Sequence, residues 1–249
     1  LVRAEIGKLL SPKVWIFLLL GAVTFSVLAV SLTLGFAEVD GSPFQGRDDP
    51  RIQPVALSSL TGAVVFVVVL SIIGATSEFR HGTATPTFLT TPRRGRVLLA
   101  KLVVYVVAGL VYAVVSGISV VAVTLIWLDA VGVEVSLSGS NRAVLLGAGT
   151  AVALYGLLGV GLGVLVRKQV GAIVGALVYL FVLEPIIRSV PTTEPVYKWL
   201  PGGAQEAMGS TAQFAPDLLA RWQGGVLLLA YGAVLTAAAA SLNLQRDVN

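Results

Sequence analysis

The stretch AVLLGAGTAVALYGLLGVGLGVLV, residues 143–166, lies between Arg142 and Arg167 and contains no charged side chain. About 20 apolar residues are enough to cross the roughly 30 Å hydrocarbon core of a bilayer as a helix. A helix is the form such a segment takes in lipid, because it satisfies its own backbone hydrogen bonds where there is no water. This stretch therefore predicts a membrane-spanning helix.

Five further stretches are apolar enough to span a membrane. One, residues 170–187, is interrupted by Glu184 and Pro185, and another, residues 226–242, is short and rich in alanine. We expect the first span to be retained rather than cleaved as a signal peptide, because its apolar run is too long for one. The sequence thus predicts an all-α integral membrane protein with six transmembrane helices in a single domain, residues 1–249. The expected spans are residues 14–36, 55–75, 102–126, 143–166, 170–187 and 226–242.

The amino-acid composition agrees with a membrane protein and argues against several classes of function. Of the 249 residues 56% are hydrophobic and 12% are charged, whereas ordinary soluble domains carry about 25% charged residues. There is no cysteine and one histidine, His81, so the chain offers neither a thiolate nucleophile nor the usual zinc ligands. Basic residues stand between apolar segments rather than along one exposed stripe, which argues against nucleic acid as a partner. We expect no catalytic site, cofactor site or metal site in this chain.

The distribution of charge predicts the orientation in the membrane. Lys and Arg residues near the ends of spans remain on the cytoplasmic side. When the six spans alternate in direction, most of the 17 Lys and Arg residues fall on the side of both termini and most acidic residues fall on the other. We therefore expect both termini in the cytoplasm. We also expect a multi-pass protein of a bacterial cell membrane, in contact with membrane lipid.

The connection between spans two and three reads GATSEFRHGTATPTFLTTPRRGRVLLAKL, residues 74–102. Thr85 before Pro86 resembles an N-cap with proline at the first helical position, and Pro92 stops a helix that begins there. The segment predicts a short cytoplasmic helix over residues 83–91. The basic cluster that follows would also suit a simple anchor to anionic lipid; it consists of Arg93, Arg94 and Arg96.

This connection, placed between the second and third of six spans, resembles the ABC-2 family of transporter permeases. Members show a Glu-x-Arg-x-Gly-Thr pattern, a Leu-x-x-Pro-x-x-Arg stretch and a Lys at the start of the third span. Trp199-Leu200-Pro201-Gly202-Gly203-Ala204 is similar to the family's Leu-Pro-x-Gly/Ala segment ahead of the last span. The residues that fit the other patterns are Glu78, Arg80, Gly82, Thr83, Leu89, Pro92, Arg94 or Arg96, and Lys101.

The resemblance implies that residues 83–91 form a coupling helix that docks in a cleft of a cytoplasmic ATPase subunit. It implies two such subunits, which would hold the ATP and Mg, since this chain has no GxxxxGK[ST] phosphate loop. It also implies a second permease chain, identical or paralogous, and an amphipathic N-terminal helix over residues 1–13 with Glu5 and Lys8 on its polar side. The residues expected to couple to the ATPase are Glu78, Arg80, Gly82, Thr83, Phe88, Leu89, Pro92 and Arg94.

Glycines and one acid within the spans are further candidates. Glu184 is the acid closest to the apolar run of a span, and such a residue is a candidate for a transport pathway. A solvated helix end is the plainer interpretation of the same residue. Two Gly-x-x-x-Gly patterns allow close helix packing and are candidates for the interface between subunits; they are Gly159 with Gly163 and Gly171 with Gly175.

The outer connections differ in character. Residues 37–54 are rich in Asp, Gly and Pro and predict a solvated loop with little structure of its own. Residues 184–225 mix prolines with aromatic and apolar residues, which predicts short helices that lie at the outer leaflet or re-enter it.

The function expected from these features is half of the translocation pathway of an exporter that is driven by ATP hydrolysis in another subunit. Spans dominated by Val, Leu, Ala and Gly favour an amphiphilic or lipophilic cargo, such as a drug, lipid or glycolipid. An ion-coupled secondary transporter is an alternative, although it would need buried carboxylates and an inverted repeat that the sequence does not show. A membrane scaffold without transport also stays open. A membrane enzyme would need clustered polar groups in the spans, and no Ser-His or paired-Asp arrangement occurs there.

Overall fold

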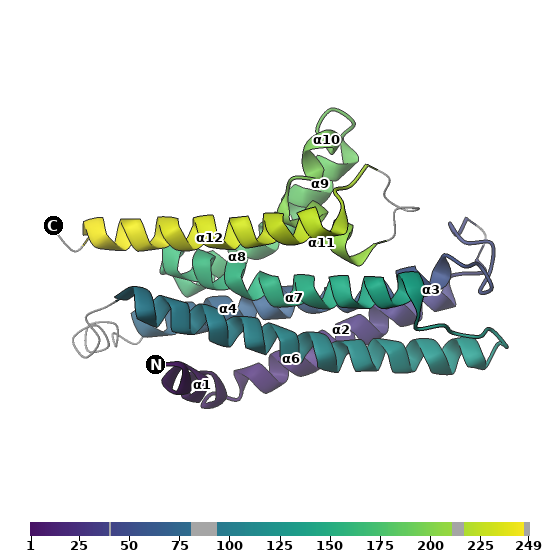
Figure 1. Cartoon of the computed structure of the whole chain (residues 1–249), viewed down its shortest axis with the longest axis horizontal. Coiled ribbons are helices and arrows are strands. Elements are labelled where there is room, and N and C mark those ends of the chain that lie inside the picture. The colour runs from purple at the N-terminus through teal and green to yellow at the C-terminus, as the bar shows by residue number, and fades with distance from the viewer. Residues whose placement is uncertain (40, 81–93, 211–216, 247–249) are drawn as a thin grey trace.

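The computed structural model describes residues 1–39, 41–80, 94–210 and 217–246, and its regular structure is helical. Six helices among these residues are long and apolar enough to cross a membrane, which confirms the predicted all-α, six-span fold. They alternate in direction, so α1 and the last turns of α12 lie at one end of the bundle (Figure 1). We call this the terminal end and the opposite one the α3 end.

The elements are α1 (Val2–Leu10), α2 (Val14–Gly35), α3 (Ile52–Ser58), η1 (Ser59–Gly62), α4 (Ala63–Arg80), α6 (Arg94–Asp129), α7 (Gly139–Val166), α8 (Gln169–Val178), η2 (Tyr179–Leu183), α9 (Glu184–Ser189), α10 (Glu194–Tyr197), α11 (Pro201–Gly209) and α12 (Arg221–Arg246).

Helix α7 lies at the centre of the bundle, in contact with α4, α6 and α12 (Figure 1). Its glycines allow these neighbours to approach without a side chain between the backbones. A Cβ atom added at Gly156 would stand 2.5 Å from the carbonyl oxygen of Tyr105 on α6, and one at Gly161 would stand 2.7 Å from Cβ of Leu235 on α12. The stretch that predicts a span most plainly is therefore also the helix around which the others are arranged.

The outward surfaces of the peripheral helices are apolar. Phe17 on α2 is 69% exposed, Ile118 on α6 is 66% exposed and Val170 on α8 is 75% exposed. Large apolar side chains in such numbers are unfavourable in water and match the hydrocarbon chains of a bilayer. The chain is a multi-pass membrane protein.

Span five is continuous where the sequence predicts an interruption. Helix α8 passes through η2, a π-helical segment, directly into α9, which begins at Glu184 with Pro185 in its first turn. Proline has no N–H to donate, and its ring clashes with the carbonyl four residues before it. The wider π turn accommodates this change without ending the helix.

The loop over residues 37–54 has more structure than its composition predicts. Asp49 is 7% exposed and accepts hydrogen bonds from the Gln45 N–H at 3.1 Å and from the Arg51 guanidinium at 2.6 Å. Arg51 also donates to the carbonyl oxygen of Pro43 at 3.0 Å. The guanidinium holds the pKa of Asp49 well below its usual range. Residues 37–39 and 41–51 form turns and bends rather than regular structure, and the contacts of Asp49 give these turns more order than their composition predicts.

Between spans five and six the chain forms the short helices α10 and α11. Helices α9 and α10 project sideways from the bundle, and α11 returns to lie beside α12 (Figure 1). Pro201, Ala204 and Met208 of α11 are buried, because this helix packs against both α7 and α12. The sequence predicts short helices here, and the structure places α11 within the bundle.

Candidate functional site

Four charged side chains from three helices meet at the terminal end. The Lys101 ammonium of α6 donates to Glu5 Oε2 of α1 at 2.7 Å and lies 3.4 Å from Glu78 Oε1 of α4. The Lys8 ammonium of α1 donates to Glu5 Oε1 at 2.7 Å and also to Glu78. We call Glu5, Lys8, Glu78 and Lys101 the charge cluster. It joins the N-terminal helix to the end of α4 and the start of α6.

Three members of the charge cluster are buried, the fourth, Lys8, is partly exposed, and the formal charges of the four cancel. Glu5, Glu78 and Lys101 are 5%, 5% and 3% exposed. Two carboxylates and two ammonium groups balance, which is the condition for burying charge without a large cost. Removing one member would leave an uncompensated buried charge, so the three helices are held in one arrangement.

Local sequence spacing explains how α4 and α6 form their part of the cluster. Gly74 and Glu78 are four residues apart on α4, and Lys101 and Tyr105 are four apart on α6, so each pair lies on one helix face. The Tyr105 ring lies directly against Gly74, where a Cβ atom would overlap the phenol oxygen. Close packing one turn away from the cluster therefore brings Glu78 within reach of Lys101.

Acidification is expected to release α1 from the bundle. Burial alone raises the pKa of Glu5, but Lys101 and Lys8 outweigh it and hold the pKa below its ordinary 4.5. For a carboxyl whose pKa is lowered on docking, the stabilisation is complete above the pKa of the undocked state and is lost as the pH falls through the docked pKa. Docking should thus be constant down to about pH 4.5 and weaken below it.

A spin label can follow this release. The chain has no cysteine, so Ile6→Cys on the exposed face of α1 gives a single attachment point. Label mobility should rise steeply below pH 4.5, and the same label in a Glu5→Gln chain should respond weakly. An equally steep response in the Glu5→Gln chain would contradict the assignment. Burial lowers the pKa of Lys8, but its bonds to Glu5 and Glu78 more than offset this and raise the pKa above 10.5. Docking of α1 should therefore also weaken in strong alkali, where Lys8 loses its proton.

The predicted coupling residues are only partly within the described structure. Glu78 lies in the charge cluster, paired with Lys8 and Lys101 rather than solvated. Arg80 ends α4 and Arg94 begins α6. The coupling helix predicted over residues 83–91 lies outside the described residues, as do Gly82, Thr83, Phe88, Leu89 and Pro92.

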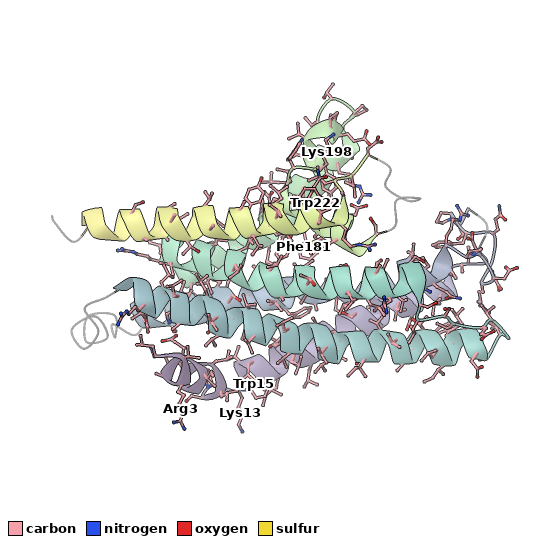
Figure 2. All side chains as sticks on the ribbon, in the orientation of Figure 1. Arg3, Lys13, Trp15, Phe181, Lys198 and Trp222 are labelled. Atoms are coloured by element: carbon pink, nitrogen blue, oxygen red, sulfur yellow. The ribbon has the colours of Figure 1, made fainter. Side chains whose placement is uncertain are left out.

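Sequence reasoning missed half of the charge cluster. It assigned Glu5 and Lys8 to the polar face of an amphipathic helix, whereas Glu5 turns inward. The side chains of Arg3 and Lys13 point away from the bundle (Figure 2), and Ile6 is 40% exposed. The position of Lys101 at the start of an apolar span indicates that it needs an acidic partner if it is buried, but it does not indicate which acid.

A second constellation lies nearer the α3 end, around Glu184. This side chain is 4% exposed, so it is not a solvated helix end. Its Oε1 accepts the backbone N–H of Gly202 at 2.8 Å, and the Tyr179 hydroxyl also hydrogen-bonds to the carboxyl. Gly202 is in the first turn of α11, whose N–H groups have no partner within the helix. The carboxylate of α9 thus caps α11, which ties the Trp199–Ala204 segment to span five.

Beside Glu184, an ion pair and an aromatic ring connect α9, α10 and α11. The Arg188 guanidinium donates to Glu206 Oε1 at 2.8 Å, and the Tyr197 hydroxyl donates to Glu206 Oε2 at 3.0 Å. Arg188 also stands over the Tyr197 ring at 5.3 Å. These groups border a cavity of about 640 Å³.

The two glycine pairs lie in different surroundings. Gly159 and Gly163 face α4: an added Cβ would stand 2.6 Å from Cβ of Ser71 and 2.8 Å from Cβ of Ala75, respectively. They therefore serve packing within the chain. Gly171 and Gly175 lie on the exposed face of α8, and a Cβ at Gly175 would meet nothing within 4 Å.

A comparison with protein families bears on this arrangement. The family model described as "ABC-2 family transporter protein" matches residues 1–183. The chain belongs to the ABC-2 transporter family. The match runs from α1 to η2 and so contains the charge cluster, whereas α9 to α12 follow it. A search of curated proteins finds no match to this ABC-2 permease.

Family membership sets the coarse function. An ABC-2 permease is a membrane component of a transporter and does not itself catalyse a reaction. Membership also implies partnership with ABC ATPase subunits.

Proposed function

We propose that this permease forms half of the translocation pathway of an ATP-driven exporter, with its terminal end in the cytoplasm of a bacterial cell. The observation that carries the proposal is the charge cluster. It ties together the end of α4 and the start of α6, which border residues 81–93 on both sides, and adds α1 to them. A displacement of this segment by an ATPase would therefore move three helices together.

The cycle follows from this link. ATP closes two ATPase subunits and moves the docked segments, and the permease helices repack from an inward-open to an outward-open arrangement. The ATP and Mg belong to the ATPase subunits. The apolar helix faces favour an amphiphilic or lipophilic cargo such as a drug, lipid or glycolipid.

A second permease chain completes the pathway. The exposed face of α8 supports this step, because Gly171 and Gly175 there leave room for close approach of another helix. Val174 between them is 53% exposed, so an apolar contact is available. Two copies of this chain, or this chain and a paralogue, would pair through this face.

Removing two apolar side chains of the predicted coupling helix, residues 83–91, is expected to weaken ATPase binding strongly. The full chain is purified gently from its native membranes, and the proteins that accompany it are identified and their stoichiometry is measured by native mass spectrometry. Wild type should bring two permease chains and two subunits of an ATPase that carries a phosphate loop. Phe88→Ala with Leu89→Ala should lower ATPase recovery about tenfold or more, since buried apolar anchors dominate such interfaces.

A matched control separates docking from general damage. Leu110→Ala with Val111→Ala removes two adjacent apolar side chains that are 46% and 47% exposed on α6, and it should leave ATPase recovery unchanged. If wild type recovers no ATPase under these conditions, the exporter proposal fails and a scaffold or an ion-coupled transporter becomes the better account.

A further inference from the structure

The 640 Å³ cavity near the α3 end has both polar and apolar walls. It opens between α2, α3 and α4 on one side and η2, α9 and α11 on the other. Ser58, Thr61 and Gln205 supply hydrogen-bonding groups, and Glu184 and Glu206 supply carboxylates. A cavity of this size is in the range that accommodates a small organic molecule.

The electrostatic balance of the lining favours a cation. Two carboxylates, Glu184 and Glu206, stand against one guanidinium, Arg188. Glu206 already pairs with Arg188, whereas neutral donors alone, Gly202 and Tyr179, hold Glu184. Within the described ranges no Lys or Arg forms an ion pair with Glu184. An ionised carboxylate buried without a cation is costly in an apolar protein, and a positively charged ligand would offset that cost.

The apolar part of the lining reaches the lipid-facing surface. Phe25 on α2 and Phe181 on η2 both line the cavity and are 43% and 55% exposed. Figure 2 labels Phe181 in this region. Aromatic rings at the rim and a carboxyl at the base suit a molecule that is lipophilic on one side and charged on the other, and rings also attract cations.

We propose that this cavity binds a lipophilic molecule with one positive charge. The charged group pairs with the Glu184 carboxylate, and the apolar part lies against Phe25 and Phe181. The inference rests on the proposed function in one respect: it makes this class of molecule the cargo of the permease. The binding step itself needs neither ATP nor the ATPase.

The test compares two ions of nearly equal size and opposite charge, tetraphenylphosphonium and tetraphenylborate, by equilibrium dialysis with the purified full chain in lipid nanodiscs. Empty nanodiscs correct for partition into lipid. We expect saturable binding of tetraphenylphosphonium at one site per chain and none of tetraphenylborate. Glu184→Gln keeps an oxygen for the Gly202 N–H and removes the charge, and it should weaken binding at least tenfold.

Two further variants keep the test decisive. Glu194→Gln removes one acid from the exposed face of α10, outside the cavity lining, and binding should stay as in wild type. Ser58→Leu adds bulk to the lining without changing Glu184 and should also weaken binding at least tenfold, which covers the case that Glu184→Gln fails to fold. Equal binding of both ions, or full binding by a folded Glu184→Gln chain or by Ser58→Leu, would overturn the proposal. Such a result would leave ATPase recovery, and with it the proposed exporter, untouched.

Discussion

Lys101→Met is expected to destabilise the permease by about 3–5 kcal/mol, the usual cost of breaking a buried ion pair by removing one partner. Methionine fits the volume of the lysine stem, so the loss is of charge rather than of packing. Two carboxylates, Glu5 and Glu78, would then share only Lys8, whose side chain is 42% exposed. We expect a lower unfolding midpoint in detergent micelles and loss of ATP-driven transport in proteoliposomes.

Two comparison variants test the electrostatic origin of this effect. Lys168→Met removes a lysine that is exposed at the same end of the bundle, and it should change the midpoint little, since exposed charges contribute about 0–1 kcal/mol. Glu5→Gln combined with Lys101→Met leaves Glu78 with Lys8 as a balanced pair and should recover a large part of the lost stability. If the double variant is no more stable than Lys101→Met alone, the loss does not come from unbalanced charge.

Gly159→Leu is expected to prevent correct packing of α7 against α4. Even a Cβ atom there would stand 2.6 Å from Cβ of Ser71 and 2.8 Å from the carbonyl oxygen of Val68. The Val68 oxygen belongs to the backbone and cannot adopt another rotamer as a side chain can, so the two helices must separate. We expect a cost of about 3 kcal/mol or more, the upper end of what overpacking produces, seen as a lower unfolding midpoint and poor recovery of folded protein.

Gly175→Leu is the matched control, because it makes the same change in the other Gly-x-x-x-Gly pattern, where nothing lies within 4 Å of an added Cβ. The isolated chain should fold with a midpoint near that of wild type. Equal destabilisation by both variants would show that the two patterns are not distinguished by packing within the chain.

The number and approximate limits of the spans could be predicted because crossing a bilayer imposes a length and an apolar composition on each segment. The ends were harder to place. The helices run past the predicted spans: the one that contains residues 55–75 begins at Ile52, and the one that contains residues 102–126 ends at Asp129. Helices continue past the hydrocarbon wherever their polar residues can pack, and hydropathy does not record this. The fifth span stays helical through Pro185 because of a π turn that no local sequence pattern predicts.

The charged contacts were less predictable than the spans. Glu78 and Lys101 could be singled out from family-like patterns, but their partners on α1 could not, because a short helix near the interface can place either face inward. The two glycine patterns look alike in sequence and face in different directions in the structure. Only the arrangement of the neighbouring helices decides between packing within the chain and contact with another chain.

The balance of the charge cluster has a consequence for a protein that works across an energised membrane. Moving one elementary charge through a potential of 100 mV costs or releases about 2.3 kcal/mol. The formal charges of Glu5, Lys8, Glu78 and Lys101 sum to zero, so the field exerts almost no net force on them as long as they move as one body. A joint shift of α1, α4 and α6 therefore gains no dependence on membrane voltage from the charge cluster itself.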